Sequence, residues 1–370
     1  MDVYDELGVT KVVNGYATLT RLGGSLMPPE VLTAMTEAGR HFVDMDELQT
    51  KASERIAAWT RNEAAFVCCG AAAGLALSTA ACITGLDEEK RASLPYTEGM
   101  KNEIIIHRYG DVHYAFAIRQ AGGRLVQIGT EGGTTSAEMD DAITDRTAAI
   151  FYFYKPTTNA GQVPLESGIE IARQAGIPVV VDAAAQIPPV DSLWSFTQMG
   201  ADLVIFSGGK GLRGPQSSGL IVGRKELIDA CAFNACPRNF IGRPMKVGKE
   251  ELVGLMTAVR CYLDLDHDQL KQTYEDQVQT VIGAFADHPY ISARRSFPSE
   301  AGQPMPRAEI VFDEAGLGIT RDEVLRQLVS GDPCIELAEA GDSGVFVNPQ
   351  TLQTGQEVFI VARIREIVTP

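Results

Sequence analysis

The chain has little of several features that mark membrane or secreted proteins. No apolar run approaches the roughly 20 residues that a membrane-spanning helix requires. The N-terminal segment MDVYDELGVT carries acidic residues where a secretory signal peptide would have a basic stretch and then an apolar one. We therefore expect a cytoplasmic protein that does not bind membranes.

Cysteine and histidine are both scarce. The seven cysteines are scattered apart from the vicinal pair Cys68 and Cys69, and an odd number without regular spacing does not suit a disulfide framework. The five histidines show no metal-ligand spacing with those cysteines. The sequence therefore predicts reduced thiols and no metal site.

Positive charge is in deficit as well. The 48 acidic residues outnumber the 32 basic ones, which gives a formal net charge of -16 at pH 7. A protein that holds RNA or DNA has to neutralise phosphates with lysine and arginine, so we expect no nucleic-acid partner. What the chain has in plenty is core-forming sequence: 45% of its 370 residues are hydrophobic, enough for one large domain and a smaller one.

Between about residues 64 and 222, short β-rich runs alternate with helical patterns. The expected strands are 64–67, 103–107, 124–128, 148–154, 178–182, 202–206 and 219–222. The expected helices among them include 71–84, 111–121, 166–175 and 192–199. Runs such as VVVD and DLVIF are apolar almost throughout, as strands covered on both faces are. Only twelve residues, rich in Gly, Ser and Pro, separate the last two strands, which favours an antiparallel return. The pattern predicts an α/β protein with a mostly parallel mixed sheet.

The flanking regions differ in character. The first fifty residues predict an arm and a helix at 29–42, with the acidic run DMDE at 44–47 as the N-terminal cap of a further helix. After residue 248 comes a long helical stretch broken near 264–268, followed by a β-like run, a helix and short strands. The β-like run is 307–312, the helix is 321–329, and the strands lie near Ile335 and at 345–347. We expect an arm (1–50), a large domain (51–248) and a smaller α+β C-terminal domain (249–370).

Three features follow expected strands, at the edge where open α/β sheets bind ligands. The segment CGAAAG at 69–74 leads straight into a helix, and its backbone N–H groups would suit an anion, although a tight turn explains it equally well. Asp182 ends the strand PVVVD and by itself would be taken as a turn cap. Lys210 lies in SGGKG, which lacks the glycine spacing of a nucleotide-binding P-loop.

Taken together, the three features are specific. Asp182 and Lys210 are 28 residues apart, the length of one strand–helix–strand unit, so both are expected at the same sheet edge as the small-residue loop. Pyridoxal 5′-phosphate (PLP) requires an anion cup for its phosphate, a carboxylate for its pyridine nitrogen and a lysine for its imine. The combination predicts a PLP enzyme in which Lys210 forms the Schiff base.

With these residues in view, the chain resembles the bacterial selenocysteine synthase-like group of fold-type I PLP enzymes, in particular its D-glucosaminate-6-phosphate ammonia lyases. The resemblance runs over nearly the whole chain. It is carried by LTRLGGS at 19–25, GAAAG at 70–74, DAAAQ at 182–186, SGGK at 207–210 with GP at 214–215, and IGRPMKVG at 241–248. The last segment is specific to this group. The resemblance implies the aminotransferase-like fold type I.

The resemblance also implies which residues hold the cofactor. Lys210 would be the Schiff-base lysine and Asp182 the partner of the pyridine nitrogen. The residues at the phosphate would be Gly70, Ala71 and Ser207, with Ala72 counted among the cofactor-binding positions. Cys69 departs from the relatives, which often carry a hydroxyl residue there, so backbone N–H groups would have to suffice.

Two more positions surround the expected ring. Ala184 would pack under it and Gln186 would reach its phenolic oxygen. For the opposite face we choose His113, with Tyr114 as the second choice, although a histidine on a helix surface is a plain alternative. For substrate carboxylate or phosphate, the candidates are Arg21, Arg243, Lys246 and Arg307. Each of these alone would also be explained as a surface or interface charge.

The resemblance favours α,β-elimination. A β-hydroxy amino acid derived from a sugar, with or without a phosphate, would lose its α-proton to the Lys210 amine and hydroxide from its β-carbon. The product would hydrolyse to a 2-keto acid and ammonia. A homo-oligomer, at least a dimer, is expected, with the arm near Arg21 reaching a neighbour's active site.

Other activities stay open. A racemase or a transaminase would keep the same lysine and aspartate. Selenium transfer to seryl-tRNA requires a tRNA-binding surface, which the net charge disfavours. A binding protein without catalysis is disfavoured because every expected cofactor position is occupied.

Overall fold

The computed structural model describes residues 2–108, 112–130, 132–157 and 161–369. They form two compact units, a large unit of Met27–Asp264 and a small unit of Met1–Leu26 with Leu265–Pro370. These boundaries differ from the expected 50/51 and 248/249. They differ because helices near both expected boundaries pack within the large unit.

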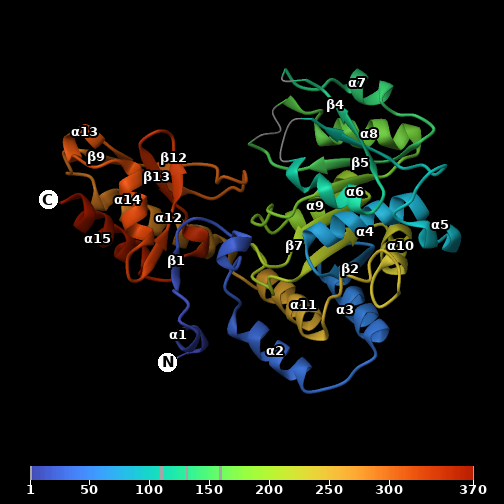
Figure 1. The fold of residues 1–370 in the computed structure, drawn as a ribbon, viewed down its shortest axis with the longest axis horizontal. Coiled ribbons are helices and arrows are strands. Elements are labelled where there is room, and N and C mark those ends of the chain that lie inside the picture. The colour runs from blue at the N-terminus through green and yellow to red at the C-terminus, as the bar shows by residue number, and fades with distance from the viewer. Residues whose placement is uncertain (1, 109–111, 131, 158–160, 370) are drawn as a thin grey trace. The chain divides into compact units, whose positions relative to one another are not determined.

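Three helices that we expected outside or at the rim of the large domain are packed into the large unit (Figure 1). Helix α2 (Pro29–Gly39) contacts α11 (Lys249–Leu263), and α3 (Met45–Trp59) contacts both α11 and the first strand of the large sheet. Asp44 caps α3, because its Oδ1 accepts the N–H groups of Asp46 and Glu47, each at 2.9 Å. The expected cap in the acidic run is confirmed.

The large unit is built on a seven-stranded sheet in the order β2-β8-β7-β6-β5-β3-β4. Its strands are β2 (Ala64–Cys68), β3 (Glu103–His107), β4 (Arg124–Ile128), β5 (Thr147–Phe153), β6 (Val179–Asp182), β7 (Leu203–Ser207) and β8 (Gly219–Gly223). All neighbours are parallel except that β8 runs antiparallel to both β2 and β7. The mostly parallel mixed sheet and the antiparallel return are confirmed.

Helices cover both faces of this sheet, which explains why its strands are apolar nearly throughout. One core layer includes Ile104, Phe151 and Ile205 and packs under α4 and α10. The other includes Val181 and Phe206 and packs under α3, α8, α9 and α11. The remaining helices of the large unit are α4 (Ala71–Thr84), α5 (Glu88–Ser93), α6 (Phe116–Gln120), α7 (Ser136–Asp141), α8 (Leu165–Ala175), α9 (Ser192–Met199) and α10 (Lys225–Asn234). In place of the helix expected at 111–121, the structure has a short 3₁₀ turn, η2 (Val112–Ala115), followed by α6. Residue 111 lies outside the described residues.

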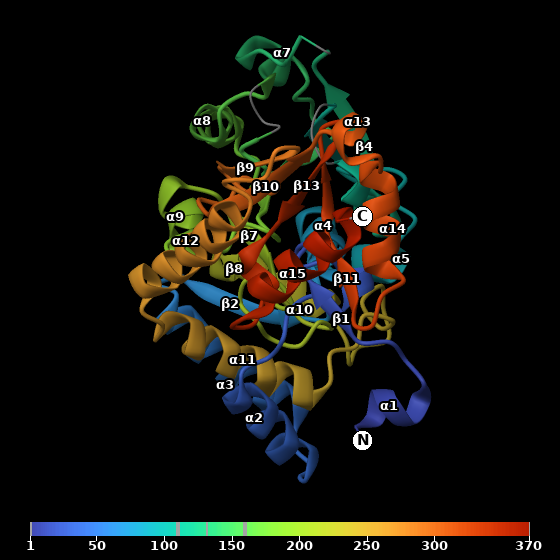
Figure 2. The same cartoon turned by 90° about the vertical axis from the view of Figure 1, so that its left-hand side faces the viewer.

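The small unit has a four-stranded antiparallel sheet in the order β12-β13-β10-β9, covered by helices on one side (Figure 2). Its elements are α1 (Val3–Leu7), β1 (Val12–Asn14), η1 (Thr20–Leu22), α12 (His267–Ala284), β9 (Ile291–Ser296), β10 (Arg307–Phe312), α13 (Glu314–Leu317), α14 (Arg321–Val329), β11 (Cys334–Glu336), β12 (Ala338–Ala340), β13 (Gly344–Val347), η4 (Pro349–Thr351) and α15 (Gln356–Val368). The arm contributes β1, which pairs in parallel with β11. We did not expect β1, β9, β12 or α15.

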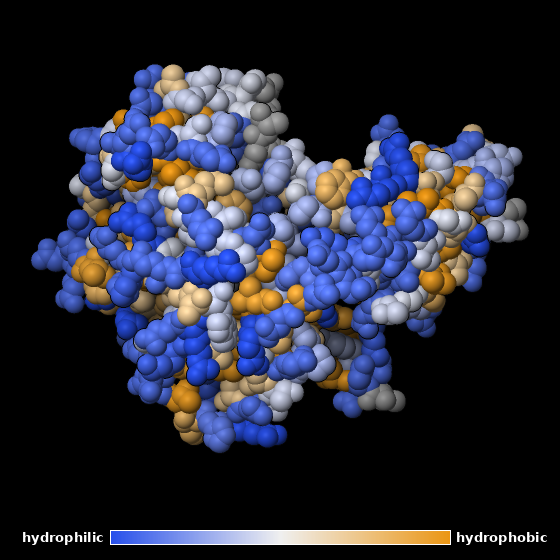
Figure 3. All heavy atoms as spheres, turned by 180° about the vertical axis from the view of Figure 1, so that it is seen from behind, coloured by the Kyte–Doolittle hydropathy of each residue, from blue (hydrophilic) through white to orange (hydrophobic). Residues whose placement is uncertain are grey.

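Polar surface predominates on the face of the molecule shown in Figure 3, with hydrophobic residues in small groups among it. Within the described ranges, no helix combines the length and the apolar character that crossing a bilayer demands.

Candidate active site

Five strands of the large unit meet at one edge of the sheet. Their register places Cys68 of β2, Gly219 of β8 and Ser207 of β7 side by side. Asp182, the last residue of β6, is level with Ile205 of β7 and with Phe153 of β5. Adjacent strands are about 4.8 Å apart, so these strand ends form one short, continuous rim.

The polar side chains of this rim lie on the face covered by α4. Asp182 is paired with Ile205 and Phe153, both of which belong to the core layer under α4. Side chains that are paired across strands share a face, and Ser207 follows Ile205 by two residues, so Ser207 shares it too. Helix α4 approaches closely at Gly74, where an added Cβ would lie 2.7 Å from Cγ2 of Ile205.

The start of α4 is shaped for an anion. Its N-cap is Gly70, with a φ of 147° that L side chains rarely adopt, and no side chain among the described residues caps the helix. Gly219 packs so tightly that an added Cβ would lie 2.5 Å from the Gly70 carbonyl carbon. The N–H groups of Ala71 and Ala72 therefore stand at the positive end of a 14-residue helix.

Cys69 precedes this cup and is half-buried. Burial raises the pKa of its thiol, so it is held neutral. This state suits a small packing residue and not a nucleophile. Backbone N–H groups and not a side chain at position 69 are therefore the donors that the cup offers.

Asp182 is only 8% exposed. One carboxylate oxygen accepts the N–H of Ala184 at 3.0 Å, and the N–H of Ala183 donates to Ile205 at 2.9 Å, which fixes the start of the turn. An ordinary turn cap lies at the surface, whereas a buried carboxylate is costly unless a cation or several donors meet it. The burial of Asp182 fits a carboxylate that receives a protonated ring nitrogen.

Lys210 is half-buried in a turn whose shape is set by glycines. An added Cβ on Gly209 would lie 2.5 Å from Cα of Gln216, and one on Gly211 would lie 2.1 Å from the Ile187 carbonyl oxygen. The N–H of Arg213 donates to the Lys210 carbonyl at 2.9 Å. Backbone packing therefore holds this lysine in place, unlike a lysine in a solvated loop.

The other residues expected at the cofactor differ in their exposure to solvent. Gln186 is 5% exposed and its amide donates to the Tyr154 carbonyl at 3.0 Å. The Ala184 carbonyl accepts from the Ser207 N–H at 3.4 Å, which joins the turns after β6 and β7. His113 and Tyr114 lie in η2 and are both exposed.

Arg307 is the most buried of the four candidate substrate cations, at 8% exposed. Its guanidinium lies 3.8 Å from the centre of the Phe346 ring and 3.5 Å from Glu300. Among the described residues its Nε has no hydrogen-bond partner, and burial lowers the pKa of the group. A half-satisfied buried guanidinium is suited to an anionic ligand.

The remaining three cations are exposed. Arg21 makes two hydrogen bonds to Glu336, at 2.8 and 2.9 Å, so it already has a carboxylate partner. Arg243 places Nη1 3.8 Å from Sγ of Cys236. Arg243 and Lys246 belong to the large unit, and Arg21 and Arg307 to the small one.

Sequence reasoning missed two residues at the same rim. Lys155 follows β5, and its neighbour Tyr154 donates its N–H to the Asp182 carbonyl at 2.9 Å. His107 ends β3 and is 3% exposed. Reading the end of every expected strand, as was done for β6 and β7, would have found both.

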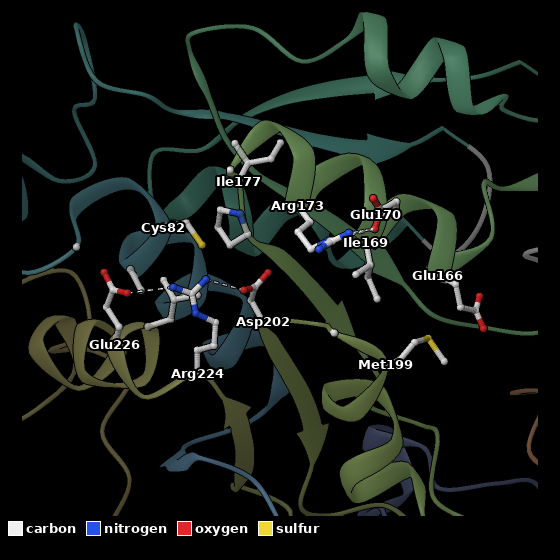
Figure 4. Close-up of a pocket in the computed structure, with 16 residues that line it drawn as sticks. Cys82, Glu166, Ile169, Glu170, Arg173, Ile177, Met199, Asp202, Arg224 and Glu226 are labelled. Atoms are coloured by element: carbon white, nitrogen blue, oxygen red, sulfur yellow. Dashed lines mark hydrogen bonds and ion pairs between the residues drawn. The ribbon is translucent and has the colours of Figure 1, made fainter.

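A separate pocket of about 600 Å³ lies at the opposite edge, where β6 and β7 begin and β8 ends (Figure 4). Both arginines that line it are paired with carboxylates, Arg224 with Asp202 at 2.7 Å and Arg173 with Glu170 at 2.6 Å. It shares no residue with the rim around Asp182 and Lys210. No cluster of histidine, cysteine and acidic residues within the described part of the chain suits a metal ion.

Comparison with known proteins identifies a family and relatives with a similar sequence. The family model described as L-seryl-tRNA selenium transferase (SelA) matches residues 12–276. The D-glucosaminate-6-phosphate ammonia lyase of Salmonella typhimurium is 33% identical over 99% of this chain and 98% of its own length. A 5′-C-glycyluridine monooxygenase-decarboxylase from a Streptomyces species is 34% identical over 99% of this chain and 92% of its own.

Solved structures agree. A D-glucosaminate-6-phosphate ammonia-lyase structure superposes with a TM-score of 0.88 at 33% identity, covering 100% of this chain and 98% of the other. A serine palmitoyltransferase from S. paucimobilis with bound PLP and myriocin matches with a TM-score of 0.58 at 12% identity, covering 97% and 88%, and shares the fold alone. A match over most of the chain, with full-length relatives above 30% identity, shows that this chain has the aminotransferase-like fold type I and belongs to the L-seryl-tRNA selenium transferase family.

Proposed function

We propose that this protein is a PLP-dependent ammonia lyase that acts on a β-hydroxy α-amino acid with a sugar-derived side chain. The observation that carries the proposal is the presence of three groups at one rim: the start of α4, which no described side chain caps, the buried Asp182 and the turn that holds Lys210. Full-length similarity to an ammonia lyase supports the reaction type.

The substrate class follows from what two relatives have in common. D-glucosaminate 6-phosphate and 5′-C-glycyluridine, named in the relatives' activities, are both α-amino acids with a hydroxyl on the next carbon and a sugar-derived remainder. The two enzymes carry out different reactions. Their shared requirement is therefore recognition of the amino-hydroxy acid, and that is the class we assign to this site.

The residues present fit the cofactor. The N–H groups of Ala71 and Ala72 with the Ser207 hydroxyl would bind its phosphate, Asp182 would keep its ring nitrogen protonated, and Lys210 would hold its aldehyde carbon. The residues expected around the ring are His113, Ala184 and Gln186, and Gly70 is expected at the phosphate. When bound, PLP supplies an electron sink for negative charge that develops at the substrate's α-carbon.

Side chains of this protein would then bind the substrate and transfer its protons. Arg307 would fix the substrate carboxylate, because the Nε of its buried guanidinium has no hydrogen-bond partner among the described residues. Arg243 and Lys246 would attract an anionic group at the far end of the substrate. Arg21 would first have to release Glu336. Lys210, released by the incoming amine, would remove the α-proton, after which the β-hydroxyl departs and the product hydrolyses to a 2-keto acid and ammonia.

The test is ammonia and keto acid formation from a panel of β-hydroxy amino acids that includes D-glucosaminate 6-phosphate. Ammonia release that depends on Lys210 supports the proposal. Inversion or exchange at the α-carbon without ammonia would indicate a racemase, and amino transfer to an added keto acid would indicate a transaminase. Oxygen uptake with CO₂ release would assign the chain the reaction type of the Streptomyces relative.

We further propose a homo-oligomer located in the cytoplasm, with neither nucleic acid nor membrane as partner. Helix α1 buries none of its residues and exposes 59% of Val3 and 69% of Leu7, which supports an arm covered by a neighbouring copy. All seven cysteines are free, as in a reducing compartment. A fully active monomer in sedimentation, or tight and salt-sensitive tRNA retention, would contradict the proposed assembly or partners.

A further inference from the structure

Elimination from a β-hydroxy amino acid needs a proton donor as well as a base, because hydroxide is a poor leaving group and departs readily only as water. In the proposed function Lys210 is the base, and Asp182 is committed to the cofactor ring. The rim must therefore supply a second group with a proton to give.

Lys155 is placed for this role by backbone pairing next to Asp182. The N–H of Tyr154 donates to the Asp182 carbonyl at 2.9 Å, and the Tyr154 carbonyl accepts from the Gln186 amide at 3.0 Å. The N–H and the carbonyl of Tyr154, the residue before Lys155, are therefore both hydrogen-bonded to residues of the rim. Lys155 itself is half-buried, so its side chain is not free in solvent.

Strand alternation gives the direction. Phe153 is level with Asp182 and belongs to the core layer under α4, whereas Tyr154 packs with the layer on the other face. Strand β5 ends at Phe153, but the Tyr154 N–H still pairs with the Asp182 carbonyl. Continued alternation would direct Lys155 to the same face as Asp182, Ser207 and the start of α4.

Other groups of the rim are less suited. Tyr154 lies on the opposite face with its ring 4.9 Å from that of Phe196, and burial raises its pKa. His107 accepts the N–H of Val163 at Nε2, at 3.3 Å, and burial keeps it neutral. His113 is exposed and is assigned to the cofactor ring.

We propose that Lys155 is the general acid that protonates the departing β-hydroxyl. This role rests on the proposed ammonia lyase function and adds a catalytic residue to it. As the Cβ–O bond breaks, its electron pair stays with oxygen, and a proton from Nζ of Lys155 completes a water molecule. Lys210 holds the former α-proton, a Cα–Cβ double bond forms, and both lysines return to their starting protonation through solvent.

The experiment separates the two proton transfers. Lys155→Met and Lys155→Arg are compared with wild type in D₂O, with D-glucosaminate 6-phosphate or the best panel substrate, following α-proton exchange by NMR and ammonia release. Arginine keeps the charge but holds its proton too firmly to donate it. Lys225→Met serves as the matched control, since Lys225 is exposed on α10 and pairs with Asp229 at 2.7 Å.

We expect both variants to keep α-proton exchange within about threefold of wild type and to lose about 10² or more in ammonia release, the usual size of a general acid effect. Binding of an analogue that lacks the β-hydroxyl, measured by calorimetry, should be unchanged, and Lys225→Met should match wild type throughout. Normal ammonia release in Lys155→Met would overturn the proposal. So would an equal loss of exchange and release together with weakened analogue binding, since that pattern belongs to a binding residue.

Failure of the underlying function looks different. In that case wild type itself would release no ammonia from any substrate of the panel, and the role of Lys155 would fall with it.

Discussion

Acid should weaken the folded state through one buried histidine, His107. Its side chain is 3% exposed, its Nε2 accepts the Val163 N–H at 3.3 Å, and its ring meets Tyr152 edge-on at 4.8 Å between centroids. Burial lowers the pKa of His107 from 6.5 to about 4. The folded protein thus prefers the neutral ring, and protonation costs both the desolvation of a charge and the accepted hydrogen bond.

The sign follows from linkage. The unfolded chain binds a proton at His107 below about pH 6.5, while the folded chain does so only near pH 4, so the stabilisation is complete above pH 6.5 and is lost as the pH falls. The full difference corresponds to about 3 kcal/mol, of which about 2 kcal/mol is lost by pH 5.

The assay is urea unfolding of the cofactor-free protein between pH 5 and 8, for wild type and His107→Gln. Glutamine offers an acceptor to Val163 without titrating, so the variant should lose about 2 kcal/mol less than wild type between pH 7 and pH 5. His41→Gln, at an exposed histidine, should follow wild type. Parallel curves for wild type and His107→Gln would refute the reasoning.

The remaining predictions concern the site. Borohydride should fix PLP on Lys210 and remove the visible absorbance; a labelled peptide with another lysine would refute the assignment. Asp182→Ala should still bind PLP but lose about 10² or more in turnover, because an unprotonated ring withdraws electrons poorly, and near-normal turnover would contradict this. Gly209→Ala should lower activity, since the new Cβ would lie 2.5 Å from Cα of Gln216 and displace the Lys210 turn, while circular dichroism should show a folded protein. Unchanged activity would show that the turn accommodates the methyl group without displacing Lys210. Arg307→Met should raise KM about tenfold or more by removing a charged hydrogen bond, and an unchanged KM would place the substrate carboxylate elsewhere.

Local sequence was sufficient for the sheet of the large unit. Buried parallel strands are apolar on both faces, so runs such as VVVD stand out against the helices between them, and β3, β4, α4 and α9 have the expected bounds. The 28-residue interval between Asp182 and Lys210 was enough to predict a shared edge, because one strand–helix–strand unit of this length returns the chain to that edge.

Short strands with mixed faces were not predictable in this way. Strand β9 (ISARRS) carries two adjacent arginines, one paired with Glu309 of β10 and the other with Glu275 of α12, so its apolar pattern is interrupted. Strand β1 is three residues long and owes its place to β11, more than 300 residues later. Such elements depend on distant partners, which local periodicity does not encode.

The sequence by itself thus determined the order of the main strands, the residue types at their ends and the class of cofactor they suit. The tertiary structure decided which helices join the large unit, that Arg307 is buried with an Nε that has no hydrogen-bond partner among the described residues, and that Lys155 directly follows the residue whose N–H pairs with Asp182. These depend on burial and on pairing between segments far apart in the chain. Such contacts contribute free energy only once the chain is folded, and they produce no periodic pattern in the neighbouring sequence.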